Sequence, residues 1–175
     1  MNLAATTTVT FRHPELEDGK EVWELIREID VLDLNSSYYY LILCEYFGNT
    51  CMVAEVDKEI VGFVSGFRHP EDQQTLFVWQ VAVAASQRGE GLAFSLIDKL
   101  LESEECEDVT TIQTTISPSN KASHALFEKV ARHVGANMEK TVRFLPRMFP
   151  GTDHETEQTY EIKPITRKNE NRFSI

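Results

Sequence analysis

Residues 77–101 read FVWQVAVAASQRGEGLAFSLIDKLL and combine three features in one continuous stretch. The first seven residues are apolar apart from one glutamine and are rich in β-branched and aromatic side chains, which is typical of a buried strand. From Leu92 onward, apolar side chains recur at helical spacing. A short loop containing Gly89 and Gly91 separates the two patterns. The stretch therefore predicts a strand, a glycine loop and the start of a helix.

The glycine loop has the properties of an anion-binding site. The first N–H groups of a helix have no intrahelical acceptor, and the helix dipole is positive at that end. Glycine at positions 89 and 91 lets the backbone approach a ligand without interference from a Cβ. We expect a diphosphate group there. An ordinary tight strand-to-helix turn is the alternative reading of so short a motif.

The spacing of the loop separates it from other phosphate loops. A Walker loop requires a Lys followed by Ser or Thr, which is absent here, and a dinucleotide fingerprint requires a preceding βαβ unit. Arg88, Gly91 and Ala93 instead satisfy the pattern [R/Q]xxGx[G/A], which resembles the coenzyme A pyrophosphate loop of the GNAT acyltransferases. That resemblance implies cofactor contacts from the loop and from the strand before it, whose backbone would pair with pantetheine: Val81, Ala82, Val83, Arg88, Gly89, Glu90, Gly91, Leu92 and Ala93.

The elements on either side of the loop predict an α/β (α+β) fold. Hydrophobic periodicity and turn residues place strands at 7–12, 51–56, 60–68, 75–83, 110–116, 137–144 and 158–162, and helices at 18–29, 38–47, 92–101 and 122–134. The helix at 38–47 is apolar on nearly all sides, so we expect it to be buried. This order is that of the GNAT fold, a mixed, mostly antiparallel twisted sheet of about six to seven strands flanked by about four helices.

Length and composition favour one domain in a reducing compartment. With 175 residues, we expect a single domain at 1–163 and a polar, mobile tail at 164–175. The three cysteines form no CxxC pair and are odd in number, so we expect neither a disulfide framework nor a zinc site, and the cytoplasm fits best. The histidines also lack metal-ligand spacing, so no metal is expected. No apolar segment approaches the roughly 20 residues that cross a bilayer.

The net charge of −11 makes nucleic acids and anionic membranes poor partners. An acidic surface attracts small cations and would suit an amine substrate. Solubility at high ionic strength explains the same charge equally well, so the charge alone does not choose between them.

Four separate blocks resemble one family, the L-2,4-diaminobutyrate acetyltransferases of ectoine biosynthesis. They lie at 32–38 (LDLNSSY), 77–83 (FVWQVAV), 88–92 (RGEGL) and 154–157 (HETE), the last leading to Tyr160, and the resemblance runs from about residue 11 to 162. It implies an acetyl-CoA-dependent N-acetyltransferase that acetylates the 4-amino group of L-2,4-diaminobutyrate to give N4-acetyl-L-2,4-diaminobutyrate, a step toward a compatible solute made under osmotic stress. It also implies direct attack of the free amine on the thioester.

The proton on the substrate amine must be removed before attack, because an alkylammonium with a pKa of about 10 is protonated at neutral pH. Many GNAT enzymes place a glutamate on the strand before the loop, where this chain has Trp79 and Gln80. Our hypothesis is that Asp33 and Glu157 hold the ammonium groups, while His154 or a bound water removes the proton.

The departing thiolate lacks the acid that the superfamily often supplies. That acid is a tyrosine on the helix after the fifth strand, where this chain carries Phe127. We expect Tyr38 or solvent to replace it, and backbone N–H groups of the strand 79–83 to polarise the thioester carbonyl. Phe127 would then pack against pantetheine. Asn120 and Ser123 are candidate cofactor contacts, although Asn120 is an equally good helix cap.

The acceptor site needs groups for a carboxylate as well as for amines. Arg68, Ser36 and Ser37 are candidates for the carboxylate. A tryptophan on a strand is more often buried in the core than part of a binding site. The position of Trp79 beside the proposed thioester argues in the opposite direction. The predicted catalytic residues are Asp33, Tyr38, His154 and Glu157, and the predicted substrate-binding residues are Asp33, Ser36, Ser37, Tyr38, Arg68, Trp79, Gln80, His154 and Glu157.

Two other functions remain open at this point. The acceptor can be another small amine, such as a polyamine or an amino-acid-like compound. The absence of the usual Glu and Tyr also permits a catalytically silent acyl-CoA-binding regulator. By analogy with other GNAT enzymes we expect a homodimer, to which the loop 144–154 with Phe149 would contribute.

Overall fold

The computed structural model describes residues 8–30, 32–151 and 153–166. Within this range the chain forms two compact units. The first contains the residues up to Phe67 together with Val78–Glu107, and the second contains Arg68–Phe77 and the residues from Asp108 onward. Strands β3 and β4 each contribute residues to both units.

All seven predicted strands and all four predicted helices are present. The strands are β1 (Thr10–Arg12), β2 (Met52–Val56), β3 (Glu59–His69), β4 (Asp72–Val83), β5 (Thr111–Ile116), β6 (Asn137–Phe144) and β7 (Glu157–Lys163), in the sheet order β1-β2-β3-β4-β5-β7-β6. The helices are α1 (Gly19–Arg27), α2 (Ser37–Phe47), α3 (Leu92–Glu102) and α4 (Lys121–His133). The described residues also form five short 3-10 helices that were not predicted, since such turns leave little periodicity to detect. They are η1 (Leu16–Asp18), η2 (Gly48–Thr50), η3 (Ala85–Gln87), η4 (Glu104–Cys106) and η5 (Pro146–Met148).

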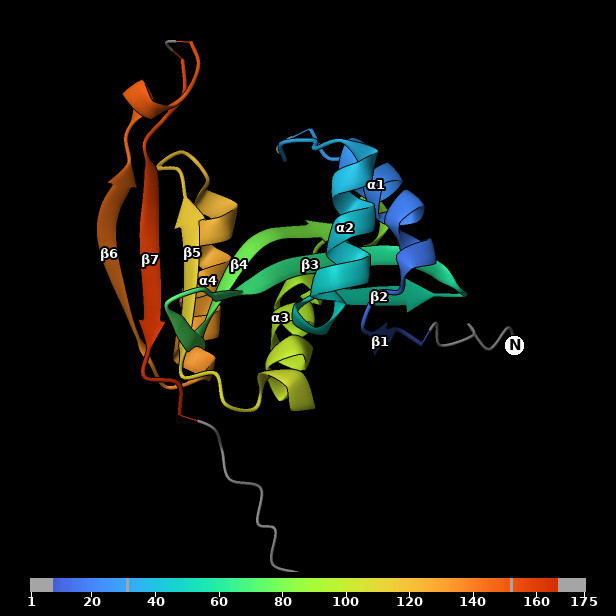
Figure 1. Cartoon of the computed structure of the whole chain (residues 1–175). Coiled ribbons are helices and arrows are strands. Elements are labelled where there is room, and N and C mark those ends of the chain that lie inside the picture. Colours follow the sequence, from blue (N-terminus) through green and yellow to red (C-terminus); the bar gives the residue numbers. More distant parts are fainter. Residues whose placement is uncertain (1–7, 31, 152, 167–175) are drawn as a thin grey trace, which may run out of the picture. The chain divides into compact units, whose positions relative to one another are not determined.

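The first unit is built on the antiparallel strands β1, β2 and β3 (Figure 1). The hairpin between β2 and β3 turns at Asp57 and Lys58, which both have positive φ (52° and 71°), as a tight hairpin turn requires. Val53 and Phe63 lie opposite each other and face the cluster formed with α1 and α2.

Helix α3 packs against the other face of these strands. A Cβ at Gly62 would lie 3.0 Å from the Leu96 side chain and 3.3 Å from Ala54 Cβ. The strands of this unit are therefore covered by apolar side chains on both faces, with α1 and α2 on one and α3 on the other.

Helix α2 is less buried than its sequence predicts. Tyr40, Leu43 and Cys44 face the core, but Tyr38 is 68% exposed and Tyr46 is 72% exposed. The expectation of a helix buried on all sides was wrong, because a sequence with few polar residues carries no marker for its solvent face.

The three cysteines are reduced and buried. Burial raises the pKa of the Cys44 thiol to about 12, with a further small increase from the negative charge of Asp18. Burial likewise raises the pKa of the Cys51 thiol to about 12, although a backbone hydrogen bond with Gly66 opposes this change.

An ion-pair network joins β1, η1 and β2 within the first unit. The Arg12 guanidinium donates to both carboxylate oxygens of Asp18 (2.6 and 2.9 Å) and to Glu55 Oε1 (2.6 Å). Partial burial would raise the pKa of Asp18, but hydrogen bonds from Arg12 and from the Glu15 amide outweigh it, so the pKa is lowered from its ordinary value of 3.8. The network therefore stabilises the fold while Asp18 is ionised.

Replacing Asp18 with Asn is expected to cost about 1–2 kcal/mol of unfolding free energy near neutral pH, because charge-assisted hydrogen bonds from Arg12 are lost. Since the folded pKa of Asp18 is depressed, its contribution is complete above the ordinary value of 3.8 and disappears as the pH falls below it. Urea unfolding at about pH 7 and about pH 3 checks this. Asp57→Asn, on the exposed β2–β3 turn, is the matched control and should change little. An equal loss at both pH values for Asp18→Asn would contradict the account.

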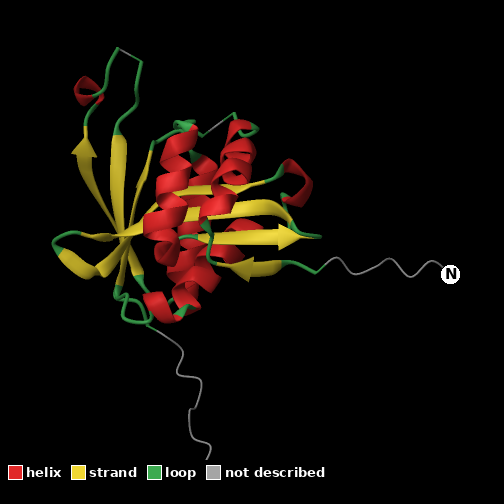
Figure 2. Cartoon of the chain, turned by 45° about the vertical axis from the view of Figure 1, so that its right-hand side comes forward, coloured by secondary structure: helices red, strands yellow, loops and turns green. Residues whose placement is uncertain are grey.

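The second unit contains the antiparallel order β5, β7 and β6, together with α4 and the turn between β3 and β4. Phe127, Val130 and Ala131 of α4 are buried. Gly135, with φ of 64°, ends the helix as the sequence predicts. The long hairpin between β6 and β7 carries η5 near its tip (Figure 2).

Two residues of the predicted tail make backbone hydrogen bonds within the second unit. Ile165 and Thr166 donate backbone hydrogen bonds to Thr110 and Val134 (both 2.9 Å). Residues 167–175, most of the predicted tail, lie outside the described residues, as does Thr7 of the predicted first strand. Among the described helices, none combines the length and the apolar character needed to cross a bilayer.

Candidate active site

The glycine loop leaves the N-terminus of α3 open to a ligand. Gly89 and Gly91 have φ of 86° and 78°, and Gly91 is the N-cap residue with no side-chain hydrogen bond to the helix. By contrast, Ser36 Oγ caps α2 and Asn120 Oδ1 caps α4. The first intrahelical bond of α3 runs from Ser95 N to Gly91 O (3.1 Å), so the amides before Ser95 point out of the helix end.

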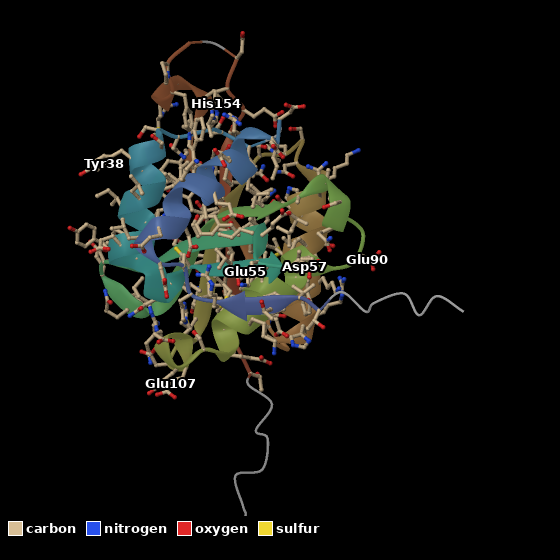
Figure 3. The ribbon with its side chains drawn as sticks, turned by 90° about the vertical axis from the view of Figure 1, so that its right-hand side faces the viewer. Tyr38, Glu55, Asp57, Glu90, Glu107 and His154 are labelled. Carbon is tan, nitrogen blue, oxygen red and sulfur yellow. The ribbon has the colours of Figure 1, made fainter. Side chains whose placement is uncertain are left out.

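The loop also has the charge and the space that a diphosphate requires. No acidic residue lies in the first turn of α3, and a Cβ at Gly89 would have no atom of the described residues within 4 Å. Arg88 is exposed, with its Nε at 3.5 Å from Val83 O. Glu90 projects away from the ribbon (Figure 3). The residues present therefore fit a coenzyme A diphosphate, held by backbone N–H groups beside a guanidinium.

Trp79 on β4 is 50% exposed, so it does not occupy the core position that average burial favours for a strand tryptophan. Its ring meets Tyr39 of α2 edge to face with centroids 5.4 Å apart, and Phe67 of β3 at 6.2 Å. The tryptophan thus presents about half of its surface to solvent while two aromatic rings fix its orientation.

Gln80, the next residue, is buried with 5% exposure. Its Nε2 donates to Asp33 O (2.8 Å) and its Oε1 accepts from Tyr40 Oη (3.2 Å). Its backbone N–H donates to Ser65 Oγ (3.2 Å). Both ends of the amide are therefore bound by the protein, and the backbone N–H of this residue already has an acceptor within the fold.

The loop before α2 presents several predicted site residues. Asp33, Ser36 and Ser37 are exposed, and Ser36 Oγ accepts from Tyr39 N (3.3 Å) as the N-cap. Tyr38 is directed outward from the first turn of α2 (Figure 3). The Asp33 carboxylate and the Tyr38 hydroxyl can thus both be reached by a solute.

Tyr39 is a residue that the sequence analysis did not single out. Its hydroxyl is buried and has no hydrogen-bond partner among the described residues, while its ring contacts Trp79. Burial raises the pKa of the Tyr39 phenol, and Tyr40 and Cys51 raise it further. In the run Tyr38-Tyr39-Tyr40 the side chains point in different directions, so the sequence alone gives no signal of which one is buried.

In the second unit, Arg68 is engaged in an ion pair. Its guanidinium donates to Asp108 Oδ1 and to Gln73 O, both at 2.6 Å, and its side chain is only 17% exposed. These contacts fix the turn between β3 and β4. They leave Arg68 less suited to bind a substrate carboxylate than the sequence suggested.

His154 lies in the hairpin loop that precedes β7, and Glu157 is the first residue of that strand. The His154 ring stacks on Phe149 with centroids 3.6 Å apart, and its Nδ1 lies 2.7 Å from Glu155 O. A carbonyl oxygen only accepts, so Nδ1 carries the hydrogen of this bond. In the neutral imidazole, Nε2 then holds a lone pair, as a general base requires.

Two of the three predicted cofactor contacts on α4 have clear structural roles. Asn120 Oδ1 accepts from Ser123 N (3.0 Å) and so caps the helix. Phe127 is only 3% exposed, as a core residue is. Contact of these residues with a cofactor stays a prediction.

Comparison with known proteins gives one consistent family. A model of the acetyltransferase (GNAT) family matches residues 19–131. The L-2,4-diaminobutyric acid acetyltransferase of Shouchella clausii is 46% identical over 93% of this chain and 91% of its own length. That of Oceanobacillus iheyensis is 48% identical over 94% of this chain and 93% of its own length.

Solved structures agree with these relatives. The diaminobutyrate acetyltransferase of Paenibacillus lautus, in complex with its substrate L-2,4-diaminobutyric acid and coenzyme A, matches with a TM-score of 0.88. It is 47% identical, and the match covers 93% of this chain and 98% of that one. The ribosomal-protein-S18-alanine N-acetyltransferase of Escherichia coli, 19% identical with a TM-score of 0.68, covers 95% of this chain and 100% of its own and shares the fold alone.

The mostly antiparallel seven-stranded fold of the described residues agrees with the family match and with the solved structure from Paenibacillus lautus. The chain belongs to the acetyltransferase (GNAT) family and, within it, to the L-2,4-diaminobutyric acid acetyltransferases.

Proposed function

We propose that this protein transfers the acetyl group of acetyl-CoA to the 4-amino group of L-2,4-diaminobutyrate. The observation that carries the proposal is the 47% identity, over 93% of the chain, to an enzyme crystallised with both diaminobutyric acid and coenzyme A. The open N-terminus of α3, with its two positive-φ glycines, supports it from the chemistry of the chain itself.

Backbone amides are proposed to hold the cofactor. Those at the start of α3 bind the diphosphate together with Arg88, and residues 81–83 pair with pantetheine. Gly89 lets the phosphates approach closely, since no atom of the part of the chain that the structure describes lies within 4 Å of its Cβ position. Acetyl-CoA supplies a thioester whose carbonyl carbon accepts the amine.

The acceptor amine is proposed to be bound and deprotonated by three groups. Asp33 and Glu157 attract the two ammonium groups of the diamine, while the Nε2 lone pair of His154 takes the proton from the 4-amino group, directly or through water. The hydrogen bond from His154 Nδ1 to Glu155 O supports this assignment, because it selects the tautomer that can act as a base.

The proposed reaction balances without a redox step. The free 4-amino nitrogen forms a bond to the carbonyl carbon and gives up one proton, the C–S bond breaks, and its electron pair stays on sulfur. Tyr38 or solvent then protonates the thiolate, and the exposed position of Tyr38 agrees with such a role.

We also propose a cellular location and an oligomeric state for the enzyme. A cytoplasmic location fits the buried, reduced cysteines, and a place in compatible-solute synthesis is proposed from the likeness to L-2,4-diaminobutyric acid acetyltransferases. A homodimer is supported by the exposed apolar side chains near the hairpin of the second unit, Val142, Phe144 and Met148. Light scattering should give twice the mass of one chain, and a monomeric mass would exclude the dimer.

The function is tested by CoA release from acetyl-CoA with L-2,4-diaminobutyrate, ornithine, lysine or putrescine as acceptor. We expect a strong preference for diaminobutyrate, with the product acetylated at the 4-amino nitrogen. Turnover with putrescine alone would replace the substrate by a polyamine, while the absence of thiol release with every one of these amines would favour a silent acyl-CoA-binding protein.

A further inference from the structure

Gln80 is a buried amide whose two hydrogen bonds both lead to the loop that carries Asp33. Gln80 and Ala82 are both buried on β4, and Ala82 belongs to the core cluster beneath α1 and α2. Gln80 therefore lies on the strand face that those helices cover. An amide buried there without partners would be costly, so its contacts decide whether it is tolerated.

The geometry fixes the orientation of this amide. Asp33 O can only accept a hydrogen bond, so the group 2.8 Å from it must be the NH₂ of Gln80. The Gln80 carbonyl then accepts from Tyr40 Oη at 3.2 Å. Tyr40, which is fully buried, in turn accepts from the backbone N–H of Asn35 at 3.4 Å.

These bonds hold the loop backbone at two positions, Asp33 O and Asn35 N. On its far side, Trp23 Nε1 of α1 donates to Asn35 O (3.2 Å). Ser36, the next residue, is fixed as the N-cap of α2. The main chain of this loop is therefore anchored from β4, α1 and α2, whereas the Asp33 side chain is exposed.

We propose that Gln80 and Tyr40 are positioning residues for the acceptor substrate. They do not contact the diamine but hold the backbone beside Asp33 so that its carboxylate is presented in one orientation. This inference rests on the proposed function for the identity of the acceptor, and it replaces the direct substrate contact that the sequence suggested for Gln80. A carboxylate on a loose loop would bind an ammonium group less well, because ordering the loop would oppose binding.

The test compares Gln80→Met with the unmodified protein. Methionine keeps the length and volume of the side chain but neither hydrogen bond. We expect KM for L-2,4-diaminobutyrate to rise about tenfold, as for the loss of one or two hydrogen bonds that order the site, while KM for acetyl-CoA stays within about twofold. Gln113→Met is the matched control, since Gln113 is a buried strand glutamine of the second unit that donates to Glu161. It should lose stability without a change in KM for diaminobutyrate.

Tyr40→Phe keeps the experiment decisive if Gln80→Met fails to fold, because it removes only the hydroxyl that links Gln80 to Asn35. It should raise the same KM, and the double variant should be less than additive since both act through one loop. Amide hydrogen exchange at Asn35 should accelerate in each variant.

Equal loss of stability in Gln80→Met and Gln113→Met, with KM for diaminobutyrate unchanged in both, would overturn the positioning role. Absence of turnover of diaminobutyrate by the unmodified protein is a different result. It would reject the proposed substrate, while the exchange measurement at Asn35 would still show whether Gln80 orders the loop.

Discussion

Replacing Asp33 with Asn is expected to lower kcat/KM for L-2,4-diaminobutyrate about 100-fold, because a charged hydrogen-bonded pair with an ammonium group is removed from the site. Asparagine keeps the shape of the side chain and leaves the backbone carbonyl that Gln80 binds in place. The loss should therefore reflect the charge rather than the loop. Steady-state rates of CoA release at varied diaminobutyrate and saturating acetyl-CoA measure it.

Asp30→Asn is the matched control for this prediction. Asp30 is exposed and lies three positions before Asp33. Its substitution changes the net charge by the same amount, so kcat/KM should stay nearly unaltered. Glu157→Gln, at the start of β7, is expected to act in the same direction as Asp33→Asn. Unchanged kcat/KM in Asp33→Asn would refute the assignment of Asp33 as an ammonium ligand, whatever the behaviour of Glu157.

A second large effect is expected at the glycine loop. Gly91→Val should raise KM for acetyl-CoA about 30-fold or more, because a β-branched residue is disfavoured at φ of 78° and the amides at the start of α3 would turn away from the diphosphate. The KM for diaminobutyrate at saturating acetyl-CoA should change little. Acetyl-CoA titration of initial rates, or calorimetric binding of CoA, measures the effect.

Gly135→Val separates backbone strain from cofactor binding. Gly135 also has positive φ (64°) but ends α4, and the nearest atom to its Cβ position is 3.7 Å away. Both variants should lose stability, while only Gly91→Val should lose affinity for CoA. A similar increase in KM for acetyl-CoA in both variants would mean that backbone strain, and not the loss of diphosphate contacts at the glycine loop, causes the effect of Gly91→Val.

The sequence predicted those features that depend on neighbouring residues. The glycine loop is local, since its conformation follows from Gly89 and Gly91 and from the helix that begins directly after them. The β2–β3 hairpin is likewise determined by a short polar turn between two apolar runs. Each such element was found within a few residues of its observed bounds.

The role of Gln80 was beyond prediction because its partners are distant in the chain. Tyr40 is 40 positions away and Asp33 is 47 positions away, so no spacing pattern connects them. The half-exposed position of Trp79 also depends on residues that are distant in the chain. Average burial favours a core tryptophan, but here the contacts with Tyr39 and Phe67 hold the ring at a half-exposed position that only the fold defines.

The burial of the three cysteines has a practical consequence for measuring this enzyme. Thiol reagents react with the thiolate, and with a pKa of about 12 the Cys44 and Cys51 side chains are almost entirely protonated at neutral pH as well as shielded from the reagent. A chromogenic disulfide should therefore report the released CoA against almost no background from the native protein. After denaturation the same reagent should count three thiols per chain, so a single titration gives both the product and the fraction of molecules that are folded.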